Sequence, residues 1–186
     1  MSLATSHFAT VRMLQSRTPD ELRSFFGTLS APDFSEMKGE YRATLLDQGC
    51  PFFGAFNLAV LNNPGNGFWM GKAFTPLGEN SGHGYNMFFR KGKIVRKFCM
   101  KTDLAPSRWD GKKSFRLTYV VYNSLCGWVG MEDEVRKVDE GIYLGIGVYG
   151  PFRHTPLAFL LEGPTAGFAR ADKEEKWPFG LFADKA

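Results

Sequence analysis

Short runs of alternating apolar and polar residues, separated by tight turns, constrain the fold of this chain more than any other feature. Such alternation is typical of a β-strand that buries one of its two faces. From Met37 onward nine runs follow one another, and Gly, Pro, Asn or Asp bounds each of them. The runs are 41–45, 56–60, 68–74, 85–89, 94–100, 115–121, 128–138, 142–148 and 157–161. The sequence therefore predicts a mainly β chain.

The connections between these runs favour antiparallel neighbours. The turns at 90–93 and 138–142 each carry a glycine where a β-hairpin needs a left-handed residue. Parallel neighbours would need much longer crossover connections. A long antiparallel meander usually closes on itself, because closure removes exposed strand edges. We therefore expect a closed up-and-down barrel of eight to ten antiparallel strands, with a two-sheet sandwich as the alternative.

A short helix is expected before the strands. Thr18 is a good N-cap, Pro19 suits the first helical position, and Asp20 and Glu21 complement the positive end of the helix dipole. This pattern predicts that the chain enters the barrel from an N-terminal helical segment.

The length of 186 residues fits a single domain. We expect 1–36 to form the N-terminal helical segment, 37–162 the barrel, and 163–186 a tail that packs on the barrel. The tail carries the aromatic residues Trp177, Phe179 and Phe182.

The cysteines and the N-terminus suggest a compartment. Cys50, Cys99 and Cys126 are odd in number and show no CxxC spacing, so a disulfide framework is not expected. No apolar run approaches the roughly 20 residues of a membrane-spanning helix. The first seventeen residues carry Arg12 and Arg17 but no acid, which fits a transit peptide or a helix on a cytoplasmic protein. We favour the cytoplasmic interpretation.

Three charged residues share a strand face with apolar residues. Lys72, Arg96 and Asp133 each fall in the apolar register of their predicted strand. A buried charge is costly unless it is paired. We expect Asp133 to pair with Lys72 or Arg96 inside the barrel, although a register shift of one residue would place all three outside. Strict alternation from an inward Lys72 places Trp69 on the outer face.

Tyrosine and tryptophan side chains are spread over several predicted strands. Rings with one polar atom suit the wall of an apolar cavity, and they suit a filled aromatic core equally well. The sequence leaves these two alternatives open. The candidate ligand-binding residues are Lys72, Tyr85, Arg96, Tyr119 and Asp133.

Several function classes lack their sequence signals. The three histidines are scattered and show no metal-ligand spacing, so we expect no metal site. The glycines of 145–147 are not followed by a helical pattern, and we expect no dinucleotide or other cofactor. The basic span 90–116 could bind single-stranded nucleic acid, but such charges usually solvate the outer face of a sheet, so a nucleic-acid partner is not favoured.

Two short segments resemble motifs of a known family. Gly67-Phe68-Trp69-Met70-Gly71-Lys72-Ala73-Phe74 and Asp133-Glu134-Val135-Arg136-Lys137-Val138-Asp139 resemble segments of the bacterial GXWXG-type proteins of unknown function. More generally, Gly39-Glu40-Tyr41 after a short helix resembles the first strand of calycins, the lipocalin and fatty-acid-binding superfamily. These resemblances imply a barrel with an internal site for a small hydrophobic molecule, and they imply no catalytic residue.

The favoured function is lipocalin-like intracellular binding of a small hydrophobic or lipidic molecule. Its head group would meet Lys72, Arg96 or Asp133. The alternative is an isomerase, cyclase or hydratase in the same barrel, which would use a buried carboxylate or a tyrosine as acid or base. Neither ligand identity nor oligomeric state follows from the sequence.

Overall fold

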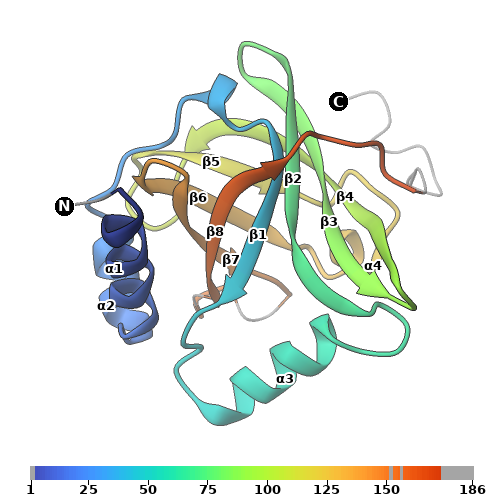
Figure 1. The fold of residues 1–186 in the computed structure, drawn as a ribbon, viewed down its shortest axis with the longest axis horizontal. Helices are drawn as coiled ribbons and strands as arrows, with labels where there is room; N and C mark the ends of the chain where they lie inside the picture. Colours follow the sequence, from blue (N-terminus) through green and yellow to red (C-terminus); the bar gives the residue numbers. More distant parts are fainter. Residues whose placement is uncertain (1–2, 151–152, 156, 173–186) are drawn as a thin grey trace.

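Eight antiparallel strands close into an up-and-down barrel in the computed structural model, which describes residues 3–150, 153–155 and 157–172 (Figure 1). Each strand pairs with the next along the chain, and the last pairs with the first. The strands are β1 Gly39–Leu45, β2 Phe68–Gly78, β3 Ser81–Arg90, β4 Lys93–Pro106, β5 Lys113–Thr118, β6 Glu132–Asp139, β7 Ile142–Val148 and β8 Leu157–Ala166. The predicted barrel is confirmed, and the sandwich alternative is not.

Helices cover the barrel at one side and at one end. Helices α1 (Leu3–Gln15) and α2 (Pro19–Phe26) lie side by side against its outer wall, and α3 (Pro51–Leu61) crosses one end (Figure 1). The predicted N-cap is present, since Thr18 and Glu21 form a reciprocal capping box at the start of α2. None of the described helices is both long and apolar enough to span a membrane.

The predicted strand at 56–60 is wrong, because this segment belongs to α3. An apolar run of this kind fits a strand or a buried helix equally well by periodicity alone. The residues that favour a helix over a strand lie at its start. Pro51 occupies the first turn, and the Cys50 thiol accepts a hydrogen bond from the Phe53 backbone N–H. The predicted strand at 128–138 begins later than expected, because Trp128 belongs to the short helix α4 (Leu125–Trp128) and β6 starts at Glu132.

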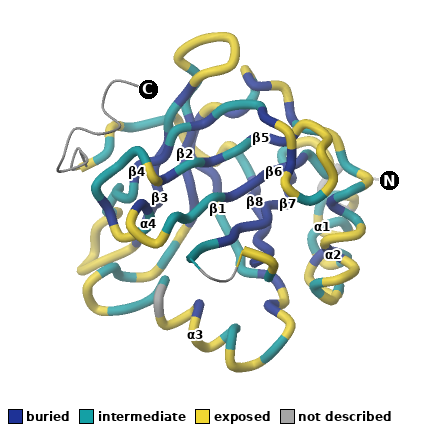
Figure 2. The backbone as a smooth tube through the Cα atoms, turned by 180° about the vertical axis from the view of Figure 1, so that it is seen from behind, coloured by how far each residue is buried: buried dark blue, intermediate teal, exposed yellow. Residues whose placement is uncertain are grey.

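Strand β7 is buried on both faces (Figure 2), and it separates two cores. Its outward residues Ile142, Leu144 and Ile146 pack with Leu22 and Phe26 of α2. The opposite face of β7 points into the barrel and carries Tyr143, Gly145 and Gly147. A strand covered on both sides has no solvent-facing positions, which explains its continuous apolar sequence.

The outer core also contains a fully buried arginine. The Arg136 guanidinium on β6 donates two hydrogen bonds of 2.7 Å to Asp110, in the connection between β4 and β5, and one of 2.8 Å to the Phe26 carbonyl. The bidentate contact lowers the pKa of Asp110. Arg136 therefore ties the N-terminal helices, a loop and the barrel wall together at one point.

The segment that follows β8 lies over the outer face of β3 and β4. The Ala169 N–H donates to the Tyr85 hydroxyl at 2.9 Å, and Asp172 exchanges hydrogen bonds with the backbone of Arg96. The predicted packing of Trp177, Phe179 and Phe182 falls outside the described residues.

We expect Asp110→Asn to lower the free energy of unfolding by about 3 kcal/mol, because it leaves the buried Arg136 charge without a counter-ion. The matched control is Asp20→Asn, which breaks an exposed 3.4 Å pair with Arg23 and should cost about 0–1 kcal/mol. Urea unfolding monitored by circular dichroism measures both. Equal losses for the two variants would show that Arg136 does not depend on Asp110.

Candidate functional site

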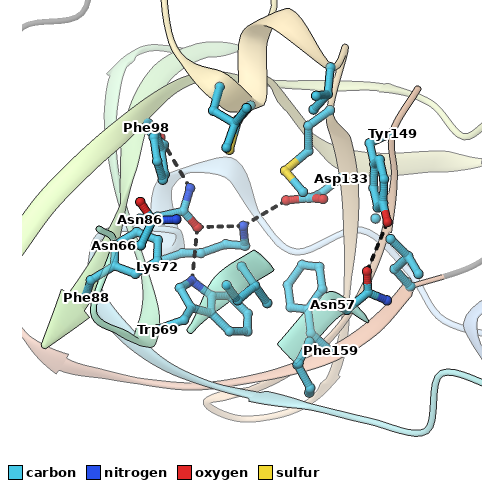
Figure 3. Close-up of a pocket in the computed structure, with 18 of the residues that line it drawn as sticks. Asn57, Asn66, Trp69, Lys72, Asn86, Phe88, Phe98, Asp133, Tyr149 and Phe159 are labelled. Carbon is cyan, nitrogen blue, oxygen red and sulfur yellow. Dashed lines mark hydrogen bonds and ion pairs between the residues drawn. The ribbon is translucent and has the colours of Figure 1, made fainter. Parts of the chain in front are cut away.

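A cavity of about 260 Å³ occupies the end of the barrel beneath α3 and α4 (Figure 3). Phe56, Asn57 and Leu61 of α3 and Leu125 and Cys126 of α4 contribute to its roof. The strands contribute an apolar wall that includes Leu45, Phe88, Phe98, Leu157 and Phe159. The other half of the barrel is filled by a packed aromatic core. The sequence left open whether the barrel has an apolar cavity or a filled aromatic core, and the barrel contains both, one in each half.

Three polar side chains, Lys72, Asn86 and Asp133, form the floor of the cavity, and the Tyr119 hydroxyl is hydrogen-bonded to all three. We call Lys72, Asn86, Tyr119 and Asp133 the polar layer. The Lys72 ammonium lies 2.8 Å from Asp133 Oδ2 and donates to the Tyr119 hydroxyl at 2.7 Å and to Asn86 Oδ1 at 3.0 Å. The side chains of Lys72 and Asp133 are only 4% and 2% exposed. The predicted internal ion pair between Lys72 and Asp133 is therefore present.

Aromatic rings surround the Lys72 ammonium. The ring centres of Trp69, Tyr119 and Phe159 lie 5.4, 5.4 and 5.1 Å from Nζ. The faces of aromatic rings attract cations at such distances, which offsets part of the cost of removing the ammonium from water. The rings and the carboxylate together hold the charge in place.

The Tyr119 hydroxyl connects the members of the polar layer. It donates to Asp133 Oδ2 at 2.9 Å and accepts from Lys72 and from the Asn86 amide. Burial, reinforced by the negative charge of Asp133, raises the pKa of Tyr119 well above its usual value. Tyr119 is therefore a neutral hydrogen-bond donor at physiological pH.

A β-bulge in β2 places Trp69 inside the barrel. Trp69 pairs with Phe88 and Gly71 with Met87, so Met70 is an extra residue without a partner. Because of this extra residue, the side chains of Trp69 and Lys72 lie on the same, inner face of the sheet. The Trp69 indole N–H donates to Asn86 Oδ1 at 3.1 Å. The expectation that Trp69 faces outward is wrong for this reason.

The glycines on either side of Trp69 serve the backbone. Gly67 has φ +91°, and a side chain there would meet the Phe89 carbonyl. A side chain on Gly71 would meet the Tyr41 carbonyl of β1. The G-x-W-x-G pattern thus encodes the close strand approach and the bulge that turn the tryptophan inward.

Tyr85 and Arg96 lie on the outer face of the barrel. A register shift between β3 and β4, with Phe98 at φ +57°, reverses the alternation that had placed Arg96 inside. Both side chains meet Glu40: the guanidinium donates at 2.7 Å and the phenol at 2.9 Å. Of the five predicted site residues, the structure thus brings together Lys72, Tyr119 and Asp133.

Two glycines on the inner face of β7 explain part of the cavity shape, although strand alternation alone predicts no role for them. A side chain on Gly145 would meet the Phe159 ring, and a Cβ on Gly147 would lie 2.5 Å from Asp133 Oδ1. The two glycines therefore make room for a ring and for a carboxylate. Their spacing of two on a strand is the signal that could have identified them.

Other polar residues of the wall satisfy one another. The Gln48 amide donates to two backbone carbonyls and accepts from Asn57, which in turn accepts from Tyr149. In the described part of the chain, no group of three or more His, Cys, Asp or Glu side chains could hold a metal ion.

Comparison with known proteins supports the fold and assigns no activity. The chain matches no protein-family model and no curated protein. Its structure is similar to the crystal structure of a protein from Thermomonospora curvata, with a TM-score of 0.59 and 15% identity over 85% of this chain and 95% of that one. At this identity the likeness concerns the fold alone. The GXWXG and calycin resemblances stay predictions.

Removing one member of the buried ion pair should lower the stability of the fold much more than removing both members. We expect Lys72→Met to lower the free energy of unfolding by about 3–5 kcal/mol, because Asp133 would remain as an uncompensated buried charge. The double variant Lys72→Met/Asp133→Leu should recover most of this loss. Urea unfolding of both variants provides the measurement. A double variant less stable than Lys72→Met would contradict the assigned pairing.

Proposed function

We propose that this protein binds a small hydrophobic molecule in the cavity at the end of its barrel, in the manner of lipocalins. The single observation that carries the proposal is the roughly 260 Å³ space with a mostly apolar wall above a buried polar layer. Ligand pockets combine these two properties, because apolar area supplies affinity and a few fixed polar groups supply orientation. The proposal includes membership of the calycin-like barrels.

The size of the cavity bounds the molecule. Benzene occupies an engineered apolar cavity of about 150 Å³. At the same volume per non-hydrogen atom as benzene in that cavity, the space beneath α3 holds about ten such atoms. The proposed ligand is therefore small, and a long-chain fatty acid would extend beyond the cavity.

The proposed location is the cytoplasm. Cys50, Cys99 and Cys126 form no disulfide, which suits a reducing compartment. The binding partner that we propose for this protein is the small hydrophobic ligand itself.

Binding is better supported than catalysis. A tyrosine that acts as a general base needs a pKa near neutrality, whereas burial moves the pKa of Tyr119 in the opposite direction. All three N–H groups of Lys72 are engaged within the polar layer, so its amine is not prepared as a nucleophile. We therefore rank an isomerase, cyclase or hydratase below a binding protein.

Filling the cavity tests the proposal. Leu157 lines the cavity and is 8% exposed, whereas Leu77 of β2 is 67% exposed and does not belong to the lining. We expect Leu157→Trp to weaken binding of 1-decanol roughly tenfold or more and Leu77→Trp to leave it unchanged, as measured by isothermal titration calorimetry.

Circular dichroism and urea unfolding check that both tryptophan variants fold, since overpacking at Leu157 costs about 1–3 kcal/mol. Native mass spectrometry of the freshly purified protein provides a second readout, in which a co-purified apolar molecule should be present in the wild type and absent from Leu157→Trp. Equal binding by wild type and a folded Leu157→Trp would place the ligand elsewhere.

A further inference from the structure

One oxygen of the buried Asp133 carboxylate lacks a donor among the described residues. Both contacts of this carboxylate use Oδ2, which lies 2.8 Å from Lys72 Nζ and accepts from the Tyr119 hydroxyl at 2.9 Å. Oδ1 faces Gly147 instead, at the place that a side chain would otherwise fill. Asp133 and Gly147 both line the cavity. A carboxylate oxygen removed from bulk water needs a hydrogen-bond donor, so this oxygen indicates a donor on the bound molecule.

The charges of the polar layer disfavour an anionic head group. The Lys72 ammonium is the cation of the cavity lining, and its three N–H groups already serve Asp133, Tyr119 and Asn86. The nearby Lys97 ammonium lies beyond the lining and donates to Asn66 Oδ1 at 2.7 Å. A carboxylate at the floor would therefore face Asp133 without a counter-charge of its own.

A cationic head group is disfavoured by the same arrangement. The Asp133 charge is already balanced by Lys72 at 2.8 Å, so a second ammonium at Oδ1 would lie close to a like charge. It would also lose its hydration in a mostly apolar space. A neutral donor avoids both costs.

We propose that the cavity selects a neutral molecule of about ten non-hydrogen atoms that carries one hydroxyl group, an alcohol or a phenol, and that this hydroxyl donates to Asp133 Oδ1. This inference rests on the proposed binding function and adds the chemistry of the head group. The polar layer acts as a fixed acceptor, and the apolar wall receives the hydrocarbon part. Gly147 is required because a side chain there would meet Asp133 Oδ1 and displace the carboxylate that accepts the hydrogen bond.

A matched set of ligands tests the head group. 1-Decanol and methyl nonyl ether are isomers with the same number of heavy atoms, but only the alcohol donates a hydrogen bond. Decanoic acid has a similar chain and is anionic at neutral pH. With the wild-type chain, we expect calorimetry to show that decanol binds at least about tenfold more tightly than either competitor, since hydrogen bonds to charged acceptors are the stronger ones.

The outcomes separate the two proposals. If the ether or the acid binds as tightly as the alcohol, the head-group inference is overturned and the binding function stands. If no member of the set binds, both are overturned. Tightest binding by decanoic acid would overturn the head-group inference in the same way.

A variant without the acceptor provides the second test. Lys72→Met/Asp133→Leu removes the carboxylate together with its buried partner, so the alcohol and the ether should bind with nearly equal affinity. Asp139→Asn is the matched control, because Asp139 lies exposed at the far end of the same strand β6, and it should keep the preference for the alcohol. A folded double variant that keeps the tenfold preference would overturn the inference, and the wild-type ligand set decides the matter if that variant does not fold.

Discussion

The ion pair between Lys72 and Asp133 organises the interior of this barrel. It joins β2 to β6 across the lumen, and Asn86 of β3 and Tyr119, the residue that follows β5, belong to the same hydrogen-bonded group. Below this level the barrel is packed with aromatic and aliphatic side chains, and above it the lumen is hollow. Two opposite charges in an apolar interior are stable only when they meet with good geometry, so the pair fixes the relative positions of the walls that surround the cavity.

The general fold could be predicted from the sequence because its signals are local. Alternation with period 2 and the glycine-containing turns at 90–93 and 138–142 specify antiparallel hairpins, and a series of hairpins favours closure. The inward positions of Lys72 and Asp133 followed from the same alternation. The helix α3 was missed because its apolar residues satisfy two periodicities, and its start depends on Pro51 and on a thiol cap.

The composition of the site was harder to predict because it depends on bulges. One extra residue, Met70, brings Trp69 into the lumen, and a register shift near Phe98 takes Arg96 out of it. Each shift reverses the side-chain direction for every residue beyond it, whereas alternation assumes a constant phase. The glycines 67 and 71 mark the first irregularity, but a single sequence does not show whether a glycine is needed for a bulge, a bend or a close contact.

The floor and the roof of the cavity belong to different kinds of structure. The floor is made of side chains locked into the barrel register, so its chemistry is tied to the integrity of the whole sheet. The roof is made of α3 and α4, which lie in connections between strands and are free of ladder pairing. Connections tolerate insertion and replacement far better than strands do. A barrel built this way can exchange its roof, and with it the shape of the molecule that fits, while it keeps the same carboxylate beneath.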